Sequence, residues 1–245
     1  MILSLKHRFL FVRGRKVAGT SVEIALSMLC GPEDIAHPLI SVDERIRQDM
    51  GGHCGNYSDN PPFERAFIEM IRAAPPERLA GIAAPPSRYG PHMSVTAVES
   101  VFGKPLGDFQ LVGVERDPYA KVISLLHMRR QFDAYRAGAK PDMAAAIGTL
   151  EEDLDDAIAR DGLKGLKSLD LYAGRTPRIL HYETLERDLA AFAADLGVAS
   201  PPLPHAKRGP LSNTIDPTRV FRRDQMDFLG DYFSEELAAF GYAGR

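Results

Sequence analysis

Residues 14–21 combine basic, small and hydroxyl side chains in an order that suits the binding of a phosphate group. They read Gly-Arg-Lys-Val-Ala-Gly-Thr-Ser, and the two glycines have the spacing of a P-loop. A P-loop has lysine directly after its second glycine, but Thr20 occupies that position here and a lysine stands inside the loop, as Lys16. A cation at that place would lie across the mouth of the loop. If a bond of the bound phosphate compound is broken there, the lysine would stand beside it.

The segments on either side of this loop explain how it would hold an anion. Phe9–Val12 reads as a buried strand and Val22–Leu29 as the helix that follows. The free N–H groups and the positive dipole end of a helix N-terminus attract a phosphate, and small residues let it come close. The same residues also fit an ordinary strand-to-helix turn with a solvated Arg-Lys pair.

A second group of polar residues stands where another expected strand becomes a helix. Phe109–Val114 predicts the strand, and Asp117 with Pro118 predicts an N-cap and first helical turn. Ligands of parallel sheets bind at the carboxyl ends of strands, which places Arg116 at the binding edge and Ser124 about two turns along the helix. An arginine fork with a hydroxyl suits a dianionic phosphate. Alternatively, Arg116 pairs with a neighbouring carboxylate and Ser124 simply packs.

Strands and helices alternate along the chain, which predicts an α/β fold with a mostly parallel sheet. A third strand is expected at Arg178–Tyr182, and the further helices at 95–102 (after Ser94 as N-cap), 151–160, 185–196 and twice in the tail from Asp216 onward. The proline-punctuated segment 32–91, with a short helix at Phe63–Ala73, is expected to be an irregular insertion in one domain spanning 1–245. We expect it to shape a substrate pocket.

Composition limits the classes of function. The chain has 245 residues, 44% of them hydrophobic and 26% charged, which is ordinary for a soluble globular protein. A net charge of −3 argues against broad nucleic-acid binding. No apolar run approaches a membrane span, and Lys6, His7 and Arg8 interrupt the pattern of a signal peptide. Cys30 and Cys54 match no metal-ligand spacing. These features favour a cytoplasmic location.

Taken together, the two phosphate-binding groups resemble those of a known family. Lys16–Ser21 is similar to the 5′-phosphosulfate loop of sulfotransferases, and Arg116–Tyr119 with Ser124 to their 3′-phosphate motif. The resemblance covers most of the chain in order, is closest to the carbohydrate-type branch, and extends to Pro91–Ser94, Leu180–Leu185, Leu203–Lys207 and Asp231–Tyr242. Arg15 stands where the family often has proline, and Lys121 where arginine is frequent.

The resemblance implies a P-loop-like three-layer α/β/α fold with a central, mostly parallel sheet. It also implies 3′-phosphoadenosine 5′-phosphosulfate as donor, 3′,5′-bisphosphoadenosine as product, a carbohydrate hydroxyl as acceptor and no metal. Lipids and small metabolites are alternative acceptors, and the sequence does not specify the oligomeric state. The residues implied for the donor are Arg15, Lys16, Val17, Ala18, Gly19, Thr20, Ser21, Arg116, Ser124, Lys207 and Arg208.

Two catalytic roles follow from the same resemblance. Lys16 would stabilise the charge that grows on the leaving phosphate, and His92 would take the acceptor's proton. Alternatively, His92 caps the helix that follows or packs against its neighbours and has no catalytic role. His53 is a weaker candidate for the base. Lys207 and Arg208 would close over the nucleotide, or belong to a solvated basic loop.

Two rival functions remain. A P-loop kinase or NTPase would need lysine at position 20 and a magnesium-binding acid, for which Glu115 and Glu183 are loose candidates. A non-catalytic nucleotide-binding protein of the same fold is the other rival.

Overall fold

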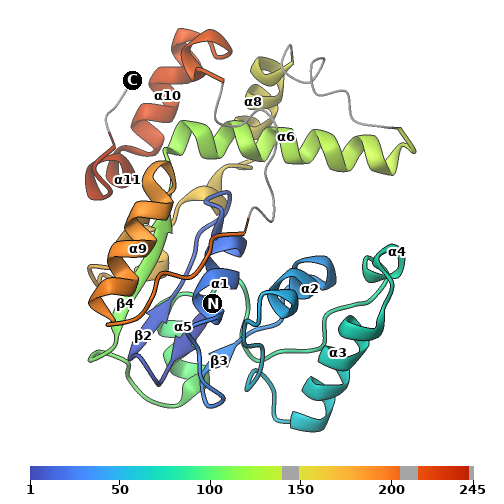
Figure 1. Cartoon of the computed structure of the whole chain (residues 1–245). Coiled ribbons are helices and arrows are strands. Elements are labelled where there is room, and N and C mark those ends of the chain that lie inside the picture. Colours follow the sequence, from blue (N-terminus) through green and yellow to red (C-terminus); the bar gives the residue numbers. More distant parts are fainter. Residues whose placement is uncertain (140–148, 205–214, 243–245) are drawn as a thin grey trace. The chain divides into compact units, whose positions relative to one another are not determined.

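Five short strands form one mixed sheet in the computed structural model, which describes residues 1–139, 149–204 and 215–242 (Figure 1). The strand order is β3-β1-β2-β4-β5. Their bounds are β1 Ile2–Ser4, β2 Phe9–Phe11, β3 Ile35–Ala36, β4 Gln110–Glu115 and β5 Arg178–His181. The strands at Phe9 and Gln110 begin and end within one or two residues of those expected from the sequence.

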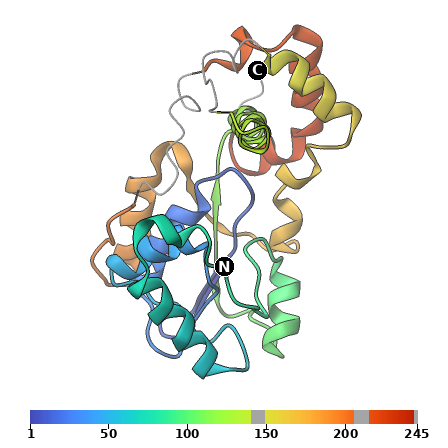
Figure 2. The same cartoon turned by 90° about the vertical axis from the view of Figure 1, so that its right-hand side faces the viewer.

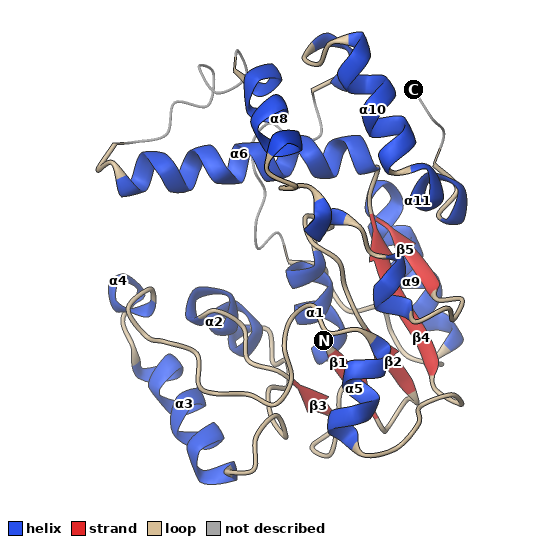
Figure 3. Ribbon diagram, turned by 180° about the vertical axis from the view of Figure 1, so that it is seen from behind, coloured by secondary structure: helices blue, strands red, loops and turns tan. Residues whose placement is uncertain are grey.

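The centre of the sheet is parallel and one side of it is antiparallel. β2 and β4 run parallel, with Phe9 opposite Gln110, whereas β1 is antiparallel to both β2 and β3. β1 and β2 form a hairpin because only the residues 5–8 separate them. The expected α/β class with parallel central strands is confirmed, and the hairpin makes the sheet mixed (Figure 3).

Helices cover both faces of this sheet. Figure 2 shows the sheet edge-on, with α1 (Gly19–Ser27) and α9 (Leu185–Asp195) on one side and α5 (Val95–Phe102) on the other. On the first side, the rings of Phe9 and Phe192 meet edge to face with 5.4 Å between their centroids. Apolar faces packed on both sides of the central strands give three layers.

The segment 32–91 is more regular than its prolines suggest. It adds β3 to the sheet and contains α2 (Ser41–Asp49), α3 (Pro61–Ala73) and α4 (Pro76–Leu79). The prolines mark helix starts, because α3 has Pro at its first positions and the Asn60 side chain accepts a hydrogen bond from Phe63 N (3.1 Å). Phe67, Ile71 and Leu79 form a small core of this segment.

The described residues divide into two compact units. The first, here called the sheet unit, holds Met1–Arg13, Ala18–Val114 and the described part of Asp170–Lys207. The second, the helical unit, holds Gly14–Val17, Glu115–Leu169 and the described part of Arg208–Arg245. Compact units of this kind also occur inside one domain, so the expectation of a single domain stays a prediction.

The helical unit has its own apolar core. Its helices are α6 Pro118–Arg136, α8 Leu150–Ala159, η1 Lys164–Leu166, η4 Pro217–Arg219, α10 Arg223–Tyr232 and α11 Ser234–Ala239. Leu126 of α6, Leu154 of α8 and Leu229 of α10 are almost fully buried in the same cluster. Two further short helices, η2 (Leu169–Tyr172) and η3 (Tyr182–Thr184), stand before and after β5.

Two helix caps expected from the sequence are present. The Ser94 hydroxyl accepts a hydrogen bond from Ala97 N (3.2 Å) at the start of α5. The Asp117 carboxylate accepts one from Ala120 N (3.1 Å) at the start of α6. In the described part of the chain, no helix is both long and apolar enough to cross a membrane.

Candidate functional site

The loop ahead of α1 leaves backbone amides pointing away from the helix. Ala18 lies in the left-handed region (φ 61°), and its carbonyl accepts hydrogen bonds from Ser21 N (3.0 Å) and Val22 N (3.3 Å). No side chain caps the helix, and among the described residues Gly19 N and Thr20 N have no hydrogen-bond acceptor. Two donors at a helix N-terminus are therefore available to an oxyanion.

Gly19 is required by its neighbour Arg13. A Cβ atom at position 19 would lie 2.1 Å from Cδ of Arg13, far inside van der Waals contact. The sequence suggests that Gly19 gives room to a ligand. The structure adds a second reason, because the absent side chain makes room for an arginine that packs across the first turn of α1.

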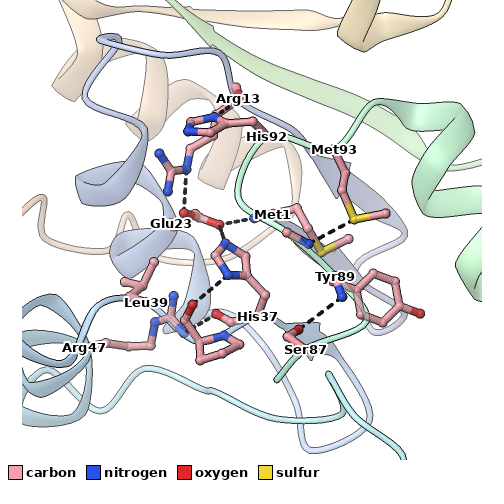
Figure 4. A network of polar contacts seen from close by, with 12 residues as sticks. Met1, Arg13, Glu23, His37, Leu39, Arg47, Ser87, Tyr89, His92 and Met93 are labelled. Carbon is pink, nitrogen blue, oxygen red and sulfur yellow. Dashed lines mark hydrogen bonds and ion pairs between the residues drawn. The ribbon is translucent and has the colours of Figure 1, made fainter. Parts of the chain in front are cut away.

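Arg13 belongs to a buried polar network that supports this turn (Figure 4). Its Nε donates to Oε2 of Glu23 on α1 (2.6 Å), and Glu23 also meets the amino group of Met1. Nε2 of His37 lies 2.9 Å from Oε1 of the same carboxylate. Glu23 of α1 thus holds together residues that flank three strands, β1, β2 and β3.

The pKa shifts in this network favour an ionised Glu23 and a neutral His37. Burial alone would raise the pKa of Glu23, but the positive groups around the carboxylate, Arg13 first among them, together outweigh it and hold the pKa well below its usual range. Burial lowers the pKa of His37 to about 4. Arg13 is permanently charged and already satisfies Glu23, so His37 stays neutral at physiological pH.

His92 is tied to the same arginine through the backbone. Its Nδ1 lies 3.1 Å from the carbonyl oxygen of Arg13. A carbonyl can only accept, so Nδ1 must carry the proton and donate it. In a neutral ring the lone pair then belongs to Nε2, which is the tautomer that a general base needs. His92 lies two residues before the Ser94 cap, so α5 and the end of β2 together set its position.

In the helical unit, the second phosphate motif contacts the residue at the centre of the first. Nη1 of Arg116 donates a long hydrogen bond to the carbonyl oxygen of Lys16 (3.4 Å). Arg116 follows the last residue of β4 directly and is only 4% exposed. Lys16 itself has a left-handed backbone (φ 65°) and a half-buried side chain. Two segments 100 positions apart in the sequence are thereby joined at Lys16.

The Lys121 side chain forms a buried ion pair inside the helical unit. Its Nζ lies 3.1 Å from Oε2 of Glu115 and 3.1 Å from the carbonyl oxygen of Leu166, and both charged side chains are fully buried. The lysine that replaces a frequent arginine is therefore half of a buried ion pair. Gly14 packs nearby, where a Cβ atom would lie 3.1 Å from Cβ of Ser168.

The remaining predicted residues occupy different environments. Arg15 is exposed, whereas Val17, Thr20 and Ser21 are buried. Ser124 is half-buried on α6. Nε2 of His53 is bonded to the carbonyl oxygen of Asp34 (2.8 Å). Lys207 and Arg208 lie outside the described residues.

Sequence reasoning missed Arg13, Glu23 and His37 as supports of the loop. Each looks unremarkable in its own segment, and only a charged residue at a buried helical position, Glu23, hints at a partner. No three His, Cys, Asp or Glu side chains of residues 1–139, 149–204 and 215–242 form a metal-holding group. That no metal is needed stays a prediction.

Comparisons with known proteins add little. No protein-family model matches the chain, and no curated protein matches it. Among solved structures, it is similar to a sulfotransferase from Alicyclobacillus acidocaldarius, with 16% identity, 95% of this chain and 93% of that chain covered, and a TM-score of 0.37. An identity of 16% and a TM-score of 0.37 are too low to show a shared fold or a shared activity.

Proposed function

We propose that this protein is a sulfotransferase that moves a sulfuryl group from 3′-phosphoadenosine 5′-phosphosulfate to a hydroxyl group of a carbohydrate. The observation that carries the proposal is the contact between Arg116 and the Lys16 carbonyl (3.4 Å). The family that the sequence resembles needs two anion sites for one donor. A contact between the two motifs supports their acting on the same molecule.

The donor's 5′ end would bind to the loop of residues 15–21. The amides of Gly19 and Thr20 have no acceptor among the described residues, and the hydroxyl groups of Thr20 and Ser21 stand at the start of the same helix. These are neutral donors, so Lys16 and Arg15 supply the positive charge. Arg116 and Ser124 would hold the 3′-phosphate, with Lys207 and Arg208 closing over the nucleotide.

The transfer step follows from these roles. The acceptor oxygen forms a bond to sulfur while the bond from sulfur to the bridging oxygen breaks, and its electrons pass to the 5′-phosphate. Lys16 stabilises the negative charge that develops there. The acceptor hydroxyl gives its proton to Nε2 of His92, since Nδ1 is held by the Arg13 carbonyl.

The buried ion pair argues against the kinase alternative. A kinase needs an acid to hold magnesium, and Glu115 is the better placed of the two candidates. Its carboxylate is fully buried and engaged by Lys121 at 3.1 Å, so it already has a cation. Position 20 is threonine, which cannot replace the lysine that a P-loop kinase places there.

The acceptor and the compartment belong to the proposal as well. We assign the segment 32–91, with α2, α3 and α4, to the acceptor side, because it adds exposed apolar side chains such as Phe63 and Met70 next to polar loops. Cys30 and Cys54 are unpaired, as in proteins of a reducing compartment such as the cytoplasm.

Thermal melting with nucleotides tests the donor. We expect 3′,5′-bisphosphoadenosine to raise the melting temperature without magnesium, because a ligand that binds only the folded state stabilises it. Stabilisation by Mg·ATP alone would support a kinase or NTPase and contradict the proposal. Stabilisation by bisphosphoadenosine without any transfer would indicate a non-catalytic binding protein.

Transfer of radiolabelled sulfate tests the reaction. The assay offers the labelled donor with panels of glycans, lipids and small hydroxyl compounds, and we expect label in the glycans. Lys16→Ala should lower the rate about 10²-fold or more, as expected when transition-state charge loses its partner. Lys104→Ala, a lysine that stacks on Phe102, is the matched control and should keep the wild-type rate.

A further inference from the structure

A cavity of the sheet unit lies where β4 and β5 begin, and these two strands are neighbours in the sheet (Figure 3). Its volume is about 590 Å³, which is within the range of small-molecule sites. The residues that line it include Gly107, Phe109, Gln110, Arg175, Pro177 and Arg178. Arg116, the second phosphate motif, follows the other end of β4, so this cavity is separate from it.

Three arginines gather at this edge of the sheet. Arg175 and Arg178 line the cavity, and each has a side chain that is 26% exposed. Arg8 directly precedes β2, which runs parallel to β4, and its guanidinium lies over the Phe109 ring (4.8 Å to the centroid). Its acidic partner, Asp108, is 71% exposed. The chain thus brings positive charge to the cavity from three separate segments.

The two arginines of the cavity wall are held in place by the protein. Nη2 of Arg175 donates a hydrogen bond to the carbonyl oxygen of Phe109 (2.9 Å). The Arg178 guanidinium lies over the Phe192 ring (5.3 Å to the centroid) and is paired with Asp195. A side chain that is already ordered loses little conformational entropy when it binds a ligand.

The carboxylates near these two arginines are weak competitors for another anion. Oε1 of Glu99 lies 3.6 Å from Nη1 of Arg175, too far for a hydrogen bond, and it accepts one from Leu106 N (2.8 Å). Asp195, the partner of Arg178, is 63% exposed. Ion pairs with exposed carboxylates contribute little to stability, so an anion in the cavity loses little by replacing them.

We propose that this cavity binds a small organic molecule that carries an oxyanion group, either a carboxylate, a phosphate or a sulfate. Arg175 and Arg178 bind the oxyanion, because a guanidinium fork matches two oxygen atoms of such a group. Phe109 and Pro177 supply apolar wall for the rest of the molecule, and Gln110, which is exposed, adds an amide. The site goes beyond the proposed sulfotransferase function and does not depend on it.

Binding of simple aromatic anions tests the class of ligand. The probes are phenyl phosphate, phenyl sulfate and benzoate, with benzyl alcohol as the neutral analogue, and NMR of ¹⁵N-labelled arginine follows the Nε–H signals. We expect the tightest anion to shift the signals of Arg175 and Arg178 and to bind about tenfold or more tightly than benzyl alcohol. That anion identifies the oxyanion group. Equal binding of benzyl alcohol and all three anions would overturn the proposal.

Gly107 permits a variant that fills the cavity without removing a contact. A Cβ atom there has nothing within 4 Å, so we expect Gly107→Leu to keep the wild-type melting temperature. It should weaken anion binding about tenfold or more, because its side chain occupies the ligand's space. Gly81→Leu is the matched control: Gly81 is exposed outside the cavity lining, and its Cβ atom would lie at an ordinary 3.5 Å from the Arg78 carbonyl oxygen.

Arg178→Gln is a second variant that changes charge and leaves the cavity open. It should weaken binding of the anions but not of benzyl alcohol. Anion binding that is unchanged in both Gly107→Leu and Arg178→Gln would overturn the proposal.

The loop of residues 15–21 could also bind the same anions, and Lys16→Ala separates the two sites. We expect this variant to keep the shifts of the Arg175 and Arg178 signals. Loss of all anion binding in Lys16→Ala would assign the anion to the loop and overturn the site at the strand starts. Because no step of the test measures sulfate transfer, failure of the proposed function would leave this result unaffected.

Discussion

Nδ1 of His92 donates a hydrogen bond to the carbonyl oxygen of Arg13 (3.1 Å), and this contact decides which ring nitrogen can accept a proton. The guanidinium of the same arginine is bonded to Glu23 (2.6 Å). The orientation of the candidate base and the support of the first turn of α1 therefore depend on one residue at the end of β2.

His92→Gln removes the base while keeping a polar side chain. We expect kcat for sulfate transfer to fall 10²–10⁴-fold, the usual contribution of a general base, with the affinity for bisphosphoadenosine unchanged. Steady-state kinetics and calorimetric binding measure the two effects. His53→Gln is the matched control because His53 also contacts a backbone carbonyl, that of Asp34. A loss of rate in the His53 variant alone would move the base to that histidine.

Gly19→Ala forces Arg13 out of its place. The new Cβ atom would lie 2.1 Å from Cδ of Arg13, and overpacking of this kind costs about 1–3 kcal/mol. We expect a lower free energy of unfolding in urea and weaker binding of bisphosphoadenosine. Gly107→Ala serves as control, because nothing lies within 4 Å of a Cβ atom there. Equal stability of the two variants would show that Arg13 does not need the space.

Lys121→Met breaks the buried ion pair with Glu115. An unpaired buried carboxylate costs about 3–5 kcal/mol, so we expect a large loss of stability in urea unfolding. The double substitution with Glu115→Gln removes both charges and should recover most of that loss. If Lys121 instead held a phosphate of the donor, the single variant would unfold normally and bind bisphosphoadenosine weakly.

The neutral state of His37 makes stability depend on pH. Its folded pKa of about 4 lies below the ordinary value of 6.5. Between these values the unfolded chain binds the extra proton, so the contribution of His37 to stability is full above about pH 6.5 and is lost as the pH decreases toward 4. The slope should approach about 1.4 kcal/mol per pH unit. Urea unfolding at pH 7.5, 6 and 5 measures it, and His37→Gln should flatten the dependence over this interval. A slope that the substitution leaves unchanged would contradict the role of His37.

Features encoded by neighbouring residues could be predicted from the sequence. The caps at Ser94 and Asp117, the strands at Phe9 and Phe109 and the loop before α1 each depend on a short segment, and all of these elements form where expected. The helix α2 and the strand β3 were not foreseen. Both lie in the segment 32–91, where the prolines obscured a regular pattern.

Contacts between distant segments could not be predicted. Arg13 and Glu23 are ten residues apart, but Arg116 and Lys16 are 100 apart, and nothing in either segment specifies the other. A sequence pattern shows which residue types are available, whereas folding decides which of them meet.

The left-handed backbone at Lys16 and Ala18 lowers the stability of the protein, but it also keeps the loop ordered for a ligand. Residues other than glycine are disfavoured in this conformation by about 1–2 kcal/mol each, and both stand in the loop proposed to hold the donor. Glycine at position 18 would relieve that strain, but it would also loosen the loop and increase the entropy lost when a ligand orders it. A screen that selects only for heat resistance should therefore favour substitutions in this loop that make the protein a poorer binder.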